Sequence, residues 1–351
     1  MYERVKRRAV SAAQPFAWPH GDEPEQTVVS ISKTSRPMAS TRSQSILQAA
    51  AVIKRSRLPV TELLNQVRLG KAIEIDTVLN VVKDVQRSVE QSPSALISLT
   101  RIRSKDEFTY MHSIAVCALM INLGRELDFP ASSLQEIGIA GLLHDIGKML
   151  IPEAVLNKAG ALSPAETNIV RTHAERGYEI LQRSRHLPEV AMDVCLSHHE
   201  KIDGSGYPRR LAGAGISLPA RMAAVCDVYD AMSSKRPYKE AGTPSECLQH
   251  MFSWQGHFDD KILAAFIKSI GIYPVGSLVK LESAHLALVV DQHKQNLTRP
   301  IVRAFYNIHK RTKIQSFEID LASESDRVVS REDPRRWGFL DWDRQWPRMI
   351  R

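Results

Sequence analysis

Hydrophobic residues recur at helical spacing through the first third of the chain. They fall every three or four positions in two runs, at Ile46, Ala49, Ala50 and Ile53 and at Val78, Val81, Val82 and Val85. This interval places them on one face of a helix. We therefore expect two or three amphipathic helices in residues 43–103. Residues 1–42 mix proline, serine, threonine and charges without a sustained period, apart from a strand-like piece at 28–31, and are expected to be poorly ordered.

The central segment, residues 104–272, has the pattern of consecutive amphipathic helices. Turn signals separate these helices at Asp128-Phe129-Pro130, Lys158-Ala159-Gly160, Leu187-Pro188 and Asp203-Gly204. One helix start is explicit, because Ser163 can act as N-cap, Pro164 suits the first turn and Glu166 completes a capping box. This predicts a helix over residues 164–182.

After Tyr273-Pro274 the pattern changes to short, alternating, β-branched pieces. These pieces lie at Ser277 to Leu281, Leu286 to Val290, Ile301 to Tyr306 and Phe317 to Leu321. The pattern predicts a mainly α protein in which a helical bundle is followed by a small C-terminal β module. We place the domain boundaries at 1–42, 43–103, 104–272 and 273–351.

The charge balance is basic. Lysine and arginine exceed aspartate and glutamate by 47 to 39, a formal net charge of +8. This favours anionic partners such as nucleotides, nucleic acid or a membrane surface. Much of the excess is terminal, where we expect solvated tails: Arg4, Lys6, Arg7, Arg8, Arg335, Arg336, Arg344, Arg348 and Arg351. No helix-turn-helix or stacking platform accompanies these cations, so nucleic acid is the weaker hypothesis.

Cysteine usage and hydropathy indicate a cytoplasmic protein without a membrane segment. The four cysteines lie far apart in sequence with no C-x-x-C pair, at Cys117, Cys195, Cys226 and Cys247. This spacing suggests neither a thiolate zinc site nor a disulfide framework. The most apolar runs, 114–123 and 137–143, are too short to span a bilayer, and we find no signal peptide.

Seven imidazole and carboxylate side chains of the central segment could assemble a metal site: His112, His144, Asp145, His173, His198, His199 and Asp227. Each comes from a predicted helix or helix end, and a site inside a bundle is built from side chains that several helices project inward. The apolar run before His144-Asp145 indicates a buried helix, in which the two side chains would point about 100° apart. A metal ion would satisfy both buried groups, and iron, manganese, zinc or nickel suits these ligands better than calcium.

Each of these residues has a simpler explanation when it is taken alone. A lone His112 or His173 is more often exposed or hydrogen-bonded than a metal ligand, and a lone Asp227 could cap a helix or pair with a cation. The two histidines His198-His199 could be a polar helix end. Their joint occurrence favours the metal site.

Cations and one aromatic side chain near these candidates indicate a phosphoester substrate. Two metal ions that share a carboxylate activate water and stabilise both oxygens of a displacement at phosphorus. Lys148 lies one turn after His144 and can meet a phosphate oxygen or the leaving group, although a surface lysine is the alternative. Arg236 and Lys239 can bind phosphate, and a glycine-containing loop presents Tyr207.

In these motifs the chain resembles the HD-GYP family, a branch of the HD phosphohydrolases that degrades cyclic di-GMP. The matching elements span about residues 104–270 and are His144-Asp145-x-x-Lys148, His173, His198-His199-Glu200, Asp203-Gly204-x-Gly206-Tyr207-Pro208, Asp227 and Arg236-Pro237-Tyr238-Lys239. The resemblance implies an HD-domain helical bundle. Residues 43–103 and the β module are similar to the surroundings of HD-GYP proteins that begin with a small domain of unknown function.

The resemblance also implies residue roles. The seven candidates His112, His144, Asp145, His173, His198, His199 and Asp227 would be the metal ligands, with Asp145 bridging. Asp145 and Lys148 would be catalytic, and Lys148, Tyr207, Arg236 and Lys239 would bind the dinucleotide. Some members carry a third metal on a glutamate one turn before the position of His112, where this chain has Phe108. We therefore expect two divalent ions, iron or manganese first, with zinc, nickel, cobalt or magnesium as alternatives.

The primary functional hypothesis is hydrolysis of cyclic di-GMP to pGpG, and in a further step to GMP, by a hydroxide that bridges the metals. One alternative is a cyclic-dinucleotide receptor with slow or no turnover that signals through a protein partner. Another is an HD hydrolase of a different nucleotide, such as cyclic GMP-AMP. The sequence does not determine the oligomeric state.

Overall fold

The computed structural model describes residues 36–102, 108–234, 242–293 and 296–350. Several expectations concern residues outside these ranges. They include the segment 1–42 up to residue 35, the strand-like piece at 28–31, and the phosphate-binding candidates Arg236 and Lys239. Phe108 begins a described helix, but its side chain is not described.

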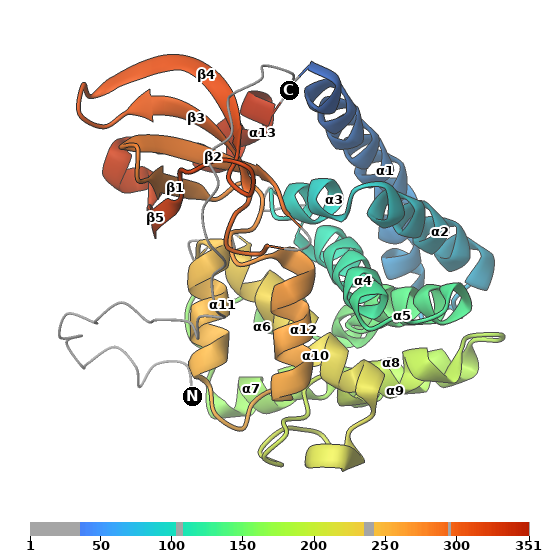
Figure 1. Cartoon of the computed structure of the whole chain (residues 1–351). Coiled ribbons are helices and arrows are strands. Elements are labelled where there is room, and N and C mark those ends of the chain that lie inside the picture. Colours follow the sequence, from blue (N-terminus) through green and yellow to red (C-terminus); the bar gives the residue numbers. More distant parts are fainter. Residues whose placement is uncertain (1–35, 103–107, 235–241, 294–295, 351) are drawn as a thin grey trace. The chain divides into compact units, whose positions relative to one another are not determined.

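Helices form the described N-terminal part, as the helical spacing predicted. They are α1 (Arg36–Arg68), α2 (Ile75–Gln91) and α3 (Pro93–Thr100). The valines that recur in the α2 sequence form its buried face, since Val78, Val82 and Val85 have no exposed surface. α2 packs against α4 and α5 of the central bundle (Figure 1).

The central bundle follows from residue 108. Its helices are α4 (Phe108–Glu126), α5 (Ala131–Leu143), η2 (Ile146–Leu150), α6 (Glu153–Leu156), α7 (Pro164–Arg171), α8 (His173–Arg183), α9 (Glu189–Ser197), η3 (Gly213–Gly215), α10 (Leu218–Ser233), α11 (Pro244–Ser253) and α12 (Asp260–Ile270). Every residue from 111 to 124 is buried. A helix that is buried on all sides needs an apolar sequence, which explains the long apolar run of α4.

The helix expected over 164–182 is divided into α7 and α8 at Thr172. The Thr172 hydroxyl donates to the Ile169 carbonyl at 2.7 Å, and Nδ1 of His173 faces the Val170 carbonyl at the same distance. These side chains occupy carbonyls that a continuous helix would use, so the helix breaks there. The predicted capping box of Ser163 and Glu166 does form at the start of α7.

The sequence had suggested that His144 and Asp145 lie inside one helix. The structure shows that they do not. α5 ends at Leu143, His144 caps it, and Asp145 has φ −102° and ψ 11° before the 3₁₀ turn η2. Gly147 lets η2 lie directly on α8, because a Cβ there would overlap the His173 carbonyl oxygen and the Gly177 backbone. The change in backbone direction and this close approach bring Asp145 beside α8.

The C-terminal part is an antiparallel sheet, shown at the upper left of Figure 1. Its strands are β1 (Leu278–Leu281), β2 (His285–Asp291), β3 (Ile301–Asn307), β4 (Thr312–Asp320) and β5 (Val328–Arg331), in the order β4-β3-β2-β1-β5. The pairing of Val279 with Ala287 and of Val289 with Val302 fixes the register of the buried face. The first three strands match the predicted pieces, and the fourth piece, 317–321, covers only the second part of β4. β5 was not predicted, because its four residues are too few to show an alternating pattern.

The C-terminal end is not the solvated tail that we expected. It forms η4 (Pro334–Trp337) and α13 (Trp342–Ile350). The indole nitrogen of Trp342 donates to the Gly276 carbonyl at 2.6 Å, and Trp346 is 1% exposed. The C-terminal segment is therefore held in place by the burial and hydrogen bonding of its tryptophans, although the neighbouring arginines favour solvent.

The start of α1 also contacts the sheet. Arg42 forms ion pairs with Glu318 at 2.6 Å and with Asp291 at 3.3 Å, and it is 9% exposed. Ser43 donates to the Ile350 carbonyl at 3.3 Å. The N-terminal helix, the sheet and α13 are thus joined by polar contacts.

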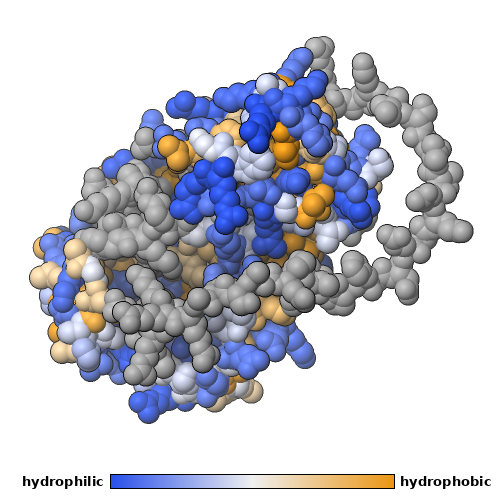
Figure 2. All heavy atoms as spheres, turned by 90° about the vertical axis from the view of Figure 1, so that its left-hand side faces the viewer, coloured by the Kyte–Doolittle hydropathy of each residue, from blue (hydrophilic) through white to orange (hydrophobic). Residues whose placement is uncertain are grey.

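The face drawn in Figure 2 is largely hydrophilic, with hydrophobic residues scattered in small groups. Among the described residues, no helix combines the length and the apolar character that crossing a membrane requires. The cysteines Cys117, Cys195, Cys226 and Cys247 are all buried.

Candidate metal centre

The fold brings the seven predicted ligands to one place. His112 comes from α4, His144 and Asp145 from the junction of α5 and η2, His173 from the start of α8, His198 and His199 from the end of α9, and Asp227 from α10. All are buried except His199, which is partly exposed. Residues that are up to 115 positions apart in sequence, 112 and 227, therefore share one polar interior.

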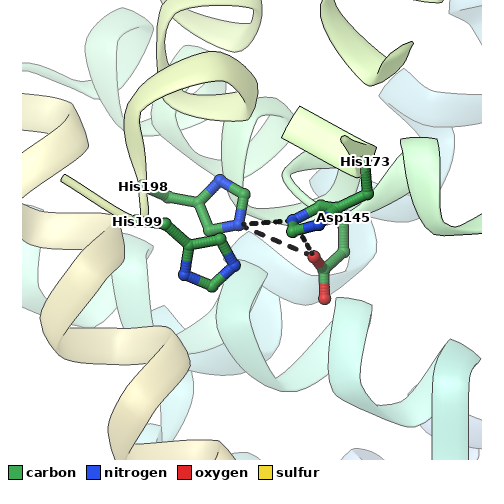
Figure 3. A group of neighbouring side chains, drawn as sticks. All are labelled: Asp145, His173, His198 and His199. Carbon is green, nitrogen blue, oxygen red and sulfur yellow. Dashed lines mark hydrogen bonds and ion pairs between the residues drawn. The ribbon is translucent and has the colours of Figure 1, made fainter. Parts of the chain in front are cut away.

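The side chains form two groups that have Asp145 in common. One group is Asp145, His173, His198 and His199, drawn in Figure 3, and the other is His112, His144, Asp145 and Asp227. In each group the potential ligand atoms all lie within 4.8 Å of one another.

The two oxygens of Asp145 face different groups. Oδ1 lies 3.3 Å from Nε2 of His173 and 3.6 Å from Nε2 of His198. Oδ2 lies 3.2 Å from Nε2 of His112 and 3.3 Å from Nε2 of His144. This carboxylate therefore stands between two pairs of imidazoles.

The far side of each of these four rings is hydrogen-bonded. Nδ1 of His144 lies 2.8 Å from the Gly141 carbonyl, that of His173 2.7 Å from Val170, and that of His198 3.0 Å from Val194. A carbonyl only accepts, so Nδ1 carries the proton and Nε2 keeps a lone pair directed at the centre. Such an outer bond is the usual support of a metal-binding histidine.

His112 is supported by a carboxylate, Asp230, which the sequence analysis missed. Nδ1 of His112 lies 2.6 Å from Oδ2 of Asp230, and Asp230 is 1% exposed. A charged outer partner makes an imidazole a stronger donor to a metal. The available signal was its spacing, three residues after Asp227 on an otherwise apolar helix, which puts both carboxylates on one helix face.

These residues fit a pair of metal ions. Oδ1 of Asp145 is buried and accepts no hydrogen bond, although two imidazole nitrogens face it. Nε2 of His112 and Nε2 of His144 are 3.2 Å apart, and those of His173 and His198 are 3.4 Å apart. Two ligand atoms bound to one ion at about 2.1 Å lie about 3.0–3.4 Å apart. Converging lone pairs at this separation match a shared cation.

The carboxylates of the centre are held in the charged form. Burial opposes this charge, but Lys148 and His144 keep the pKa of Asp145 well below its usual range. The imidazoles of His112 and His144 beside it overcome burial in the same way and keep the pKa of Asp227 well below its usual range. Both side chains are therefore available as anionic ligands.

The imidazoles differ between the two groups. Burial lowers the pKa of His173 to about 3 and keeps the pKa of His199 well below its usual range. Burial also acts to lower the pKa of His112, but its hydrogen bonds to the carboxylates of Asp145, Asp227 and Asp230 outweigh burial and raise this pKa to about 10. The Asp227 side of the centre thus attracts positive charge most strongly.

Three cationic or aromatic side chains lie beside the centre. Lys148 forms an ion pair with Oδ2 of Asp145. The ring of Tyr207 stacks on that of His199, with centroids 4.7 Å apart and planes at 26°. The guanidinium of Arg171, which the sequence analysis also missed, lies 5.1 Å from the centroid of the Tyr207 ring and is exposed. Its only signal was its position two residues before His173.

The loop that carries Tyr207 is fixed by Glu200. This carboxylate is 2% exposed and accepts from the backbone nitrogens of Arg209 at 2.7 Å and Leu211 at 3.0 Å. Gly206 lies against the Glu200 backbone, where a Cβ would approach Cα to 2.5 Å. The glycine is needed for this close approach, and the loop therefore places Tyr207 against His199.

A protein-family model described as HD domain matches residues 85–262. The matched range runs from α2 into α12 and contains both ligand groups. The chain belongs to the HD domain family.

Several relatives of this chain are named as phosphodiesterases. A cyclic di-GMP phosphodiesterase of Pseudomonas aeruginosa is 42% identical over 342 residues, which cover 96% of this chain and 80% of that protein. A 3'3'-cGAMP-specific phosphodiesterase of Vibrio cholerae is 33% identical over 193 residues, 54% of this chain and 36% of the relative. A cyclic di-GMP phosphodiesterase response regulator of Xanthomonas campestris is 34% identical over 189 residues, 53% of this chain and 50% of the relative.

A solved structure supports the fold. An HDGYP protein from Bdellovibrio bacteriovorus superposes with a TM-score of 0.52 at 16% identity, over 65% of this chain and 76% of that one. Together with the relatives above, this confirms the resemblance to the HD-GYP family and the mainly α fold with a small C-terminal sheet.

Proposed function

We propose that this protein is a metal-dependent phosphodiesterase that hydrolyses cyclic di-GMP to pGpG, and pGpG further to GMP. The observation that carries the proposal is the Asp145 carboxylate, whose two oxygens face two separate histidine pairs. One carboxylate between two ligand sets is what a pair of metal ions needs in order to act on one phosphate. The Pseudomonas relative, which aligns with nearly the whole chain, is named for this reaction.

In this proposal two divalent ions would be held on either side of Asp145, whose carboxylate belongs to both ligand groups. His112, His144 and Asp227 complete one ligand set, and His173, His198 and His199 complete the other. Imidazole with carboxylate suits iron or manganese, with zinc, nickel, cobalt and magnesium as alternatives. When bound, such ions lower the pKa of water and offset the charge of the phosphoryl group.

The protein's own side chains hold the substrate and move protons. Tyr207 presents its ring beside the partly exposed His199, and the exposed Arg171 adds positive charge there. Lys148 forms an ion pair with Asp145 and so lies at the metal centre. From there it can donate a proton or a hydrogen bond to the leaving oxygen of a phosphate bound at that centre. Arg236 and Lys239 follow α10 and are assigned to the phosphates of the dinucleotide.

The test combines metal content with turnover. We expect anaerobically purified protein to contain about two metal ions per chain and to release pGpG from cyclic di-GMP. Asp145→Asn should lose metal and turnover together, because the amide is neutral and bridges poorly. Asp341→Asn, an exposed position, is the matched control. Undiminished turnover in metal-depleted Asp145→Asn protein would contradict the proposal.

A second substrate, 3'3'-cGAMP, is favoured by three Vibrio cholerae relatives named for it, at 33%, 35% and 33% identity over about half of this chain. Measuring kcat/KM for both cyclic dinucleotides with the same preparation decides which is preferred. The same experiment tests the receptor alternative, because a receptor would bind cyclic di-GMP tightly and release no pGpG or GMP.

A further inference from the structure

A cavity of about 380 Å³ is lined by residues of α3, α4 and α12 and by Gln292, His293 and Leu297, which follow β2 in the sequence. This volume is within the usual range for small-molecule sites, about 300–1,000 Å³. The cavity is separate from the metal centre, since Asn122 of its lining follows His112 on α4 by ten residues, about 15 Å of helix.

Unsatisfied polar atoms are concentrated at this cavity. Within the described ranges, six buried side-chain nitrogen or oxygen atoms have no hydrogen-bond partner. One is Oδ1 of Asp145 in the metal centre, and three belong to residues that line the cavity, Arg101, Gln292 and His293. Buried polar groups are normally paired, so the side chains around this cavity are under-satisfied compared with the rest of the described interior.

The three atoms differ in hydrogen-bonding character. The Gln292 oxygen is an acceptor that lies against Gly271, and the amide nitrogen of Gln292 already donates to the Tyr273 carbonyl. Nε of Arg101 is a donor without an acceptor, and Nδ1 of His293 can donate or accept. Because these atoms have almost no accessible surface, a ligand in the cavity would meet Arg101 and His293 through the other nitrogens of the guanidinium and the imidazole.

The carboxylates that line the cavity already have partners. Glu126 pairs with Lys268 at 2.5 Å. Asp291 pairs at 3.3 Å with Arg42, which is not part of the lining. Neither carboxylate is left to neutralise the remaining cations.

Those cations are Arg101 and Arg125. Arg125 donates to the Val89 carbonyl at 2.8 Å, and neither guanidinium forms an ion pair with a carboxylate of the described residues. A guanidinium matches the geometry of phosphate or carboxylate oxygens, so the cavity carries an uncompensated positive charge suited to an anion.

The remaining lining is mostly apolar and includes one aromatic ring. Ile97, Ile270, Val275 and the ring of Tyr229 lie on the walls.

We propose that this cavity is a binding site for a small organic phosphate of about the size of a nucleoside monophosphate. Its phosphate lies on Arg101 and Arg125, and its planar base lies against the apolar wall.

Two kinds of ligand have this chemistry. One is a product of the hydrolysis proposed above, and the other is an unrelated mononucleotide. Calorimetric titration of the metal-loaded protein with GMP, AMP and inorganic phosphate distinguishes them. GMP binding that is tighter than AMP binding points to the product, and equal binding points to mononucleotides in general. Inorganic phosphate that binds as tightly as either nucleotide would overturn the proposal, because the apolar wall would then contribute nothing.

Variants separate this site from the metal centre. Arg101→Gln should weaken nucleotide binding about tenfold or more, which corresponds to one charge-assisted hydrogen bond. Ser94→Phe fills the cavity from the start of α3 and should have the same effect without removing a charge. Arg87→Gln, on the exposed side of α2, is the matched control. Thermal unfolding of each variant verifies that it is folded.

Asp145→Asn makes the test independent of catalysis. Because the cavity is separate from Asp145, one nucleotide site per chain should remain in this variant even when hydrolysis is lost. If Asp145→Asn abolishes nucleotide binding, or if neither cavity variant weakens it, the cavity is not the site. Neither result bears on whether the protein hydrolyses cyclic di-GMP. The cavity proposal can therefore fail while the proposed function stands, and the reverse is also true.

Discussion

The strength of each proposed metal ligand depends on the atom behind its imidazole ring. Three rings are held by carbonyl oxygens, whereas His112 is held by the buried carboxylate of Asp230. A carboxylate does more than orient the ring, because its charge raises the electron density on the opposite nitrogen. Asp230 is therefore a positioning residue for the Asp227 side of the centre.

We predict that Asp230→Asn lowers metal affinity about 10-fold to 100-fold, the usual effect of losing a charged outer partner. The amide oxygen of asparagine can still accept from Nδ1 of His112, so the fold should remain intact. Competition with a chelator measures the affinity, and Asp341→Asn is the control for loss of a negative charge. Unchanged affinity would show that Asp230 has only a structural role.

Arg171 is exposed and lies over the Tyr207 ring, so its removal should affect substrate binding more than the chemical step. We expect Arg171→Ala to raise KM for cyclic di-GMP about threefold to tenfold, in line with one cation–π contact, while kcat changes little. Arg183→Ala, exposed at the end of α8, should be neutral. A fall in kcat at constant KM would argue against this role.

At the scale of elements, the centre depends on how closely η2 approaches α8. Gly147 and Gly177 pack backbone to backbone, and this contact places Asp145 beside His173. No side chain can be inserted there without moving one element.

Gly147→Ala should therefore destabilise the protein by about 1–3 kcal/mol, as overpacking usually does, and should reduce metal content at the same time. Urea unfolding and elemental analysis measure the two effects. Gly215→Ala is the control, since nothing lies within 4 Å of a Cβ at that position. Normal stability and full metal content in Gly147→Ala would mean that the two elements separate without cost.

At the scale of the whole described chain, the sheet and the helices are linked through α13 and the start of α1. Trp346 is almost fully buried and lies against Gly276, just before β1. Arg42 connects α1 to β4 through Glu318. The basic C-terminal segment thus packs on the sheet and stabilises it.

We expect Trp346→Ala to cost about 3–5 kcal/mol of stability, typical of a large core side chain. Amide hydrogen exchange should rise in β1 to β3, whereas metal content should stay the same because the centre lies in the helical bundle. Leu340→Ala, at a residue that is 79% exposed, is the control. Loss of metal from Trp346→Ala protein would show that the sheet and the centre are coupled.

The sequence by itself determined that residues 43–103 and the central segment are mainly helical, roughly where four of the strands lie, and which seven residues are candidate ligands. The periodicity of Val78 to Val85 and the capping box at Ser163 are local properties, and local patterns specify local structure. The ligand set was recognisable because seven imidazole and carboxylate side chains occur together on the predicted helices and helix ends of the central segment.

Only the tertiary structure decided how these residues meet. That Asp145 stands between two histidine pairs, and that Asp230 supports His112, depends on contacts between helices that are distant in sequence. The break at Thr172 and the junction after Leu143 arise from side-chain bonds and a glycine contact that periodicity does not encode. The burial of Trp346 likewise needs a sheet to pack on, because hydrophobic burial is a property of the assembled core rather than of the segment that supplies the side chain.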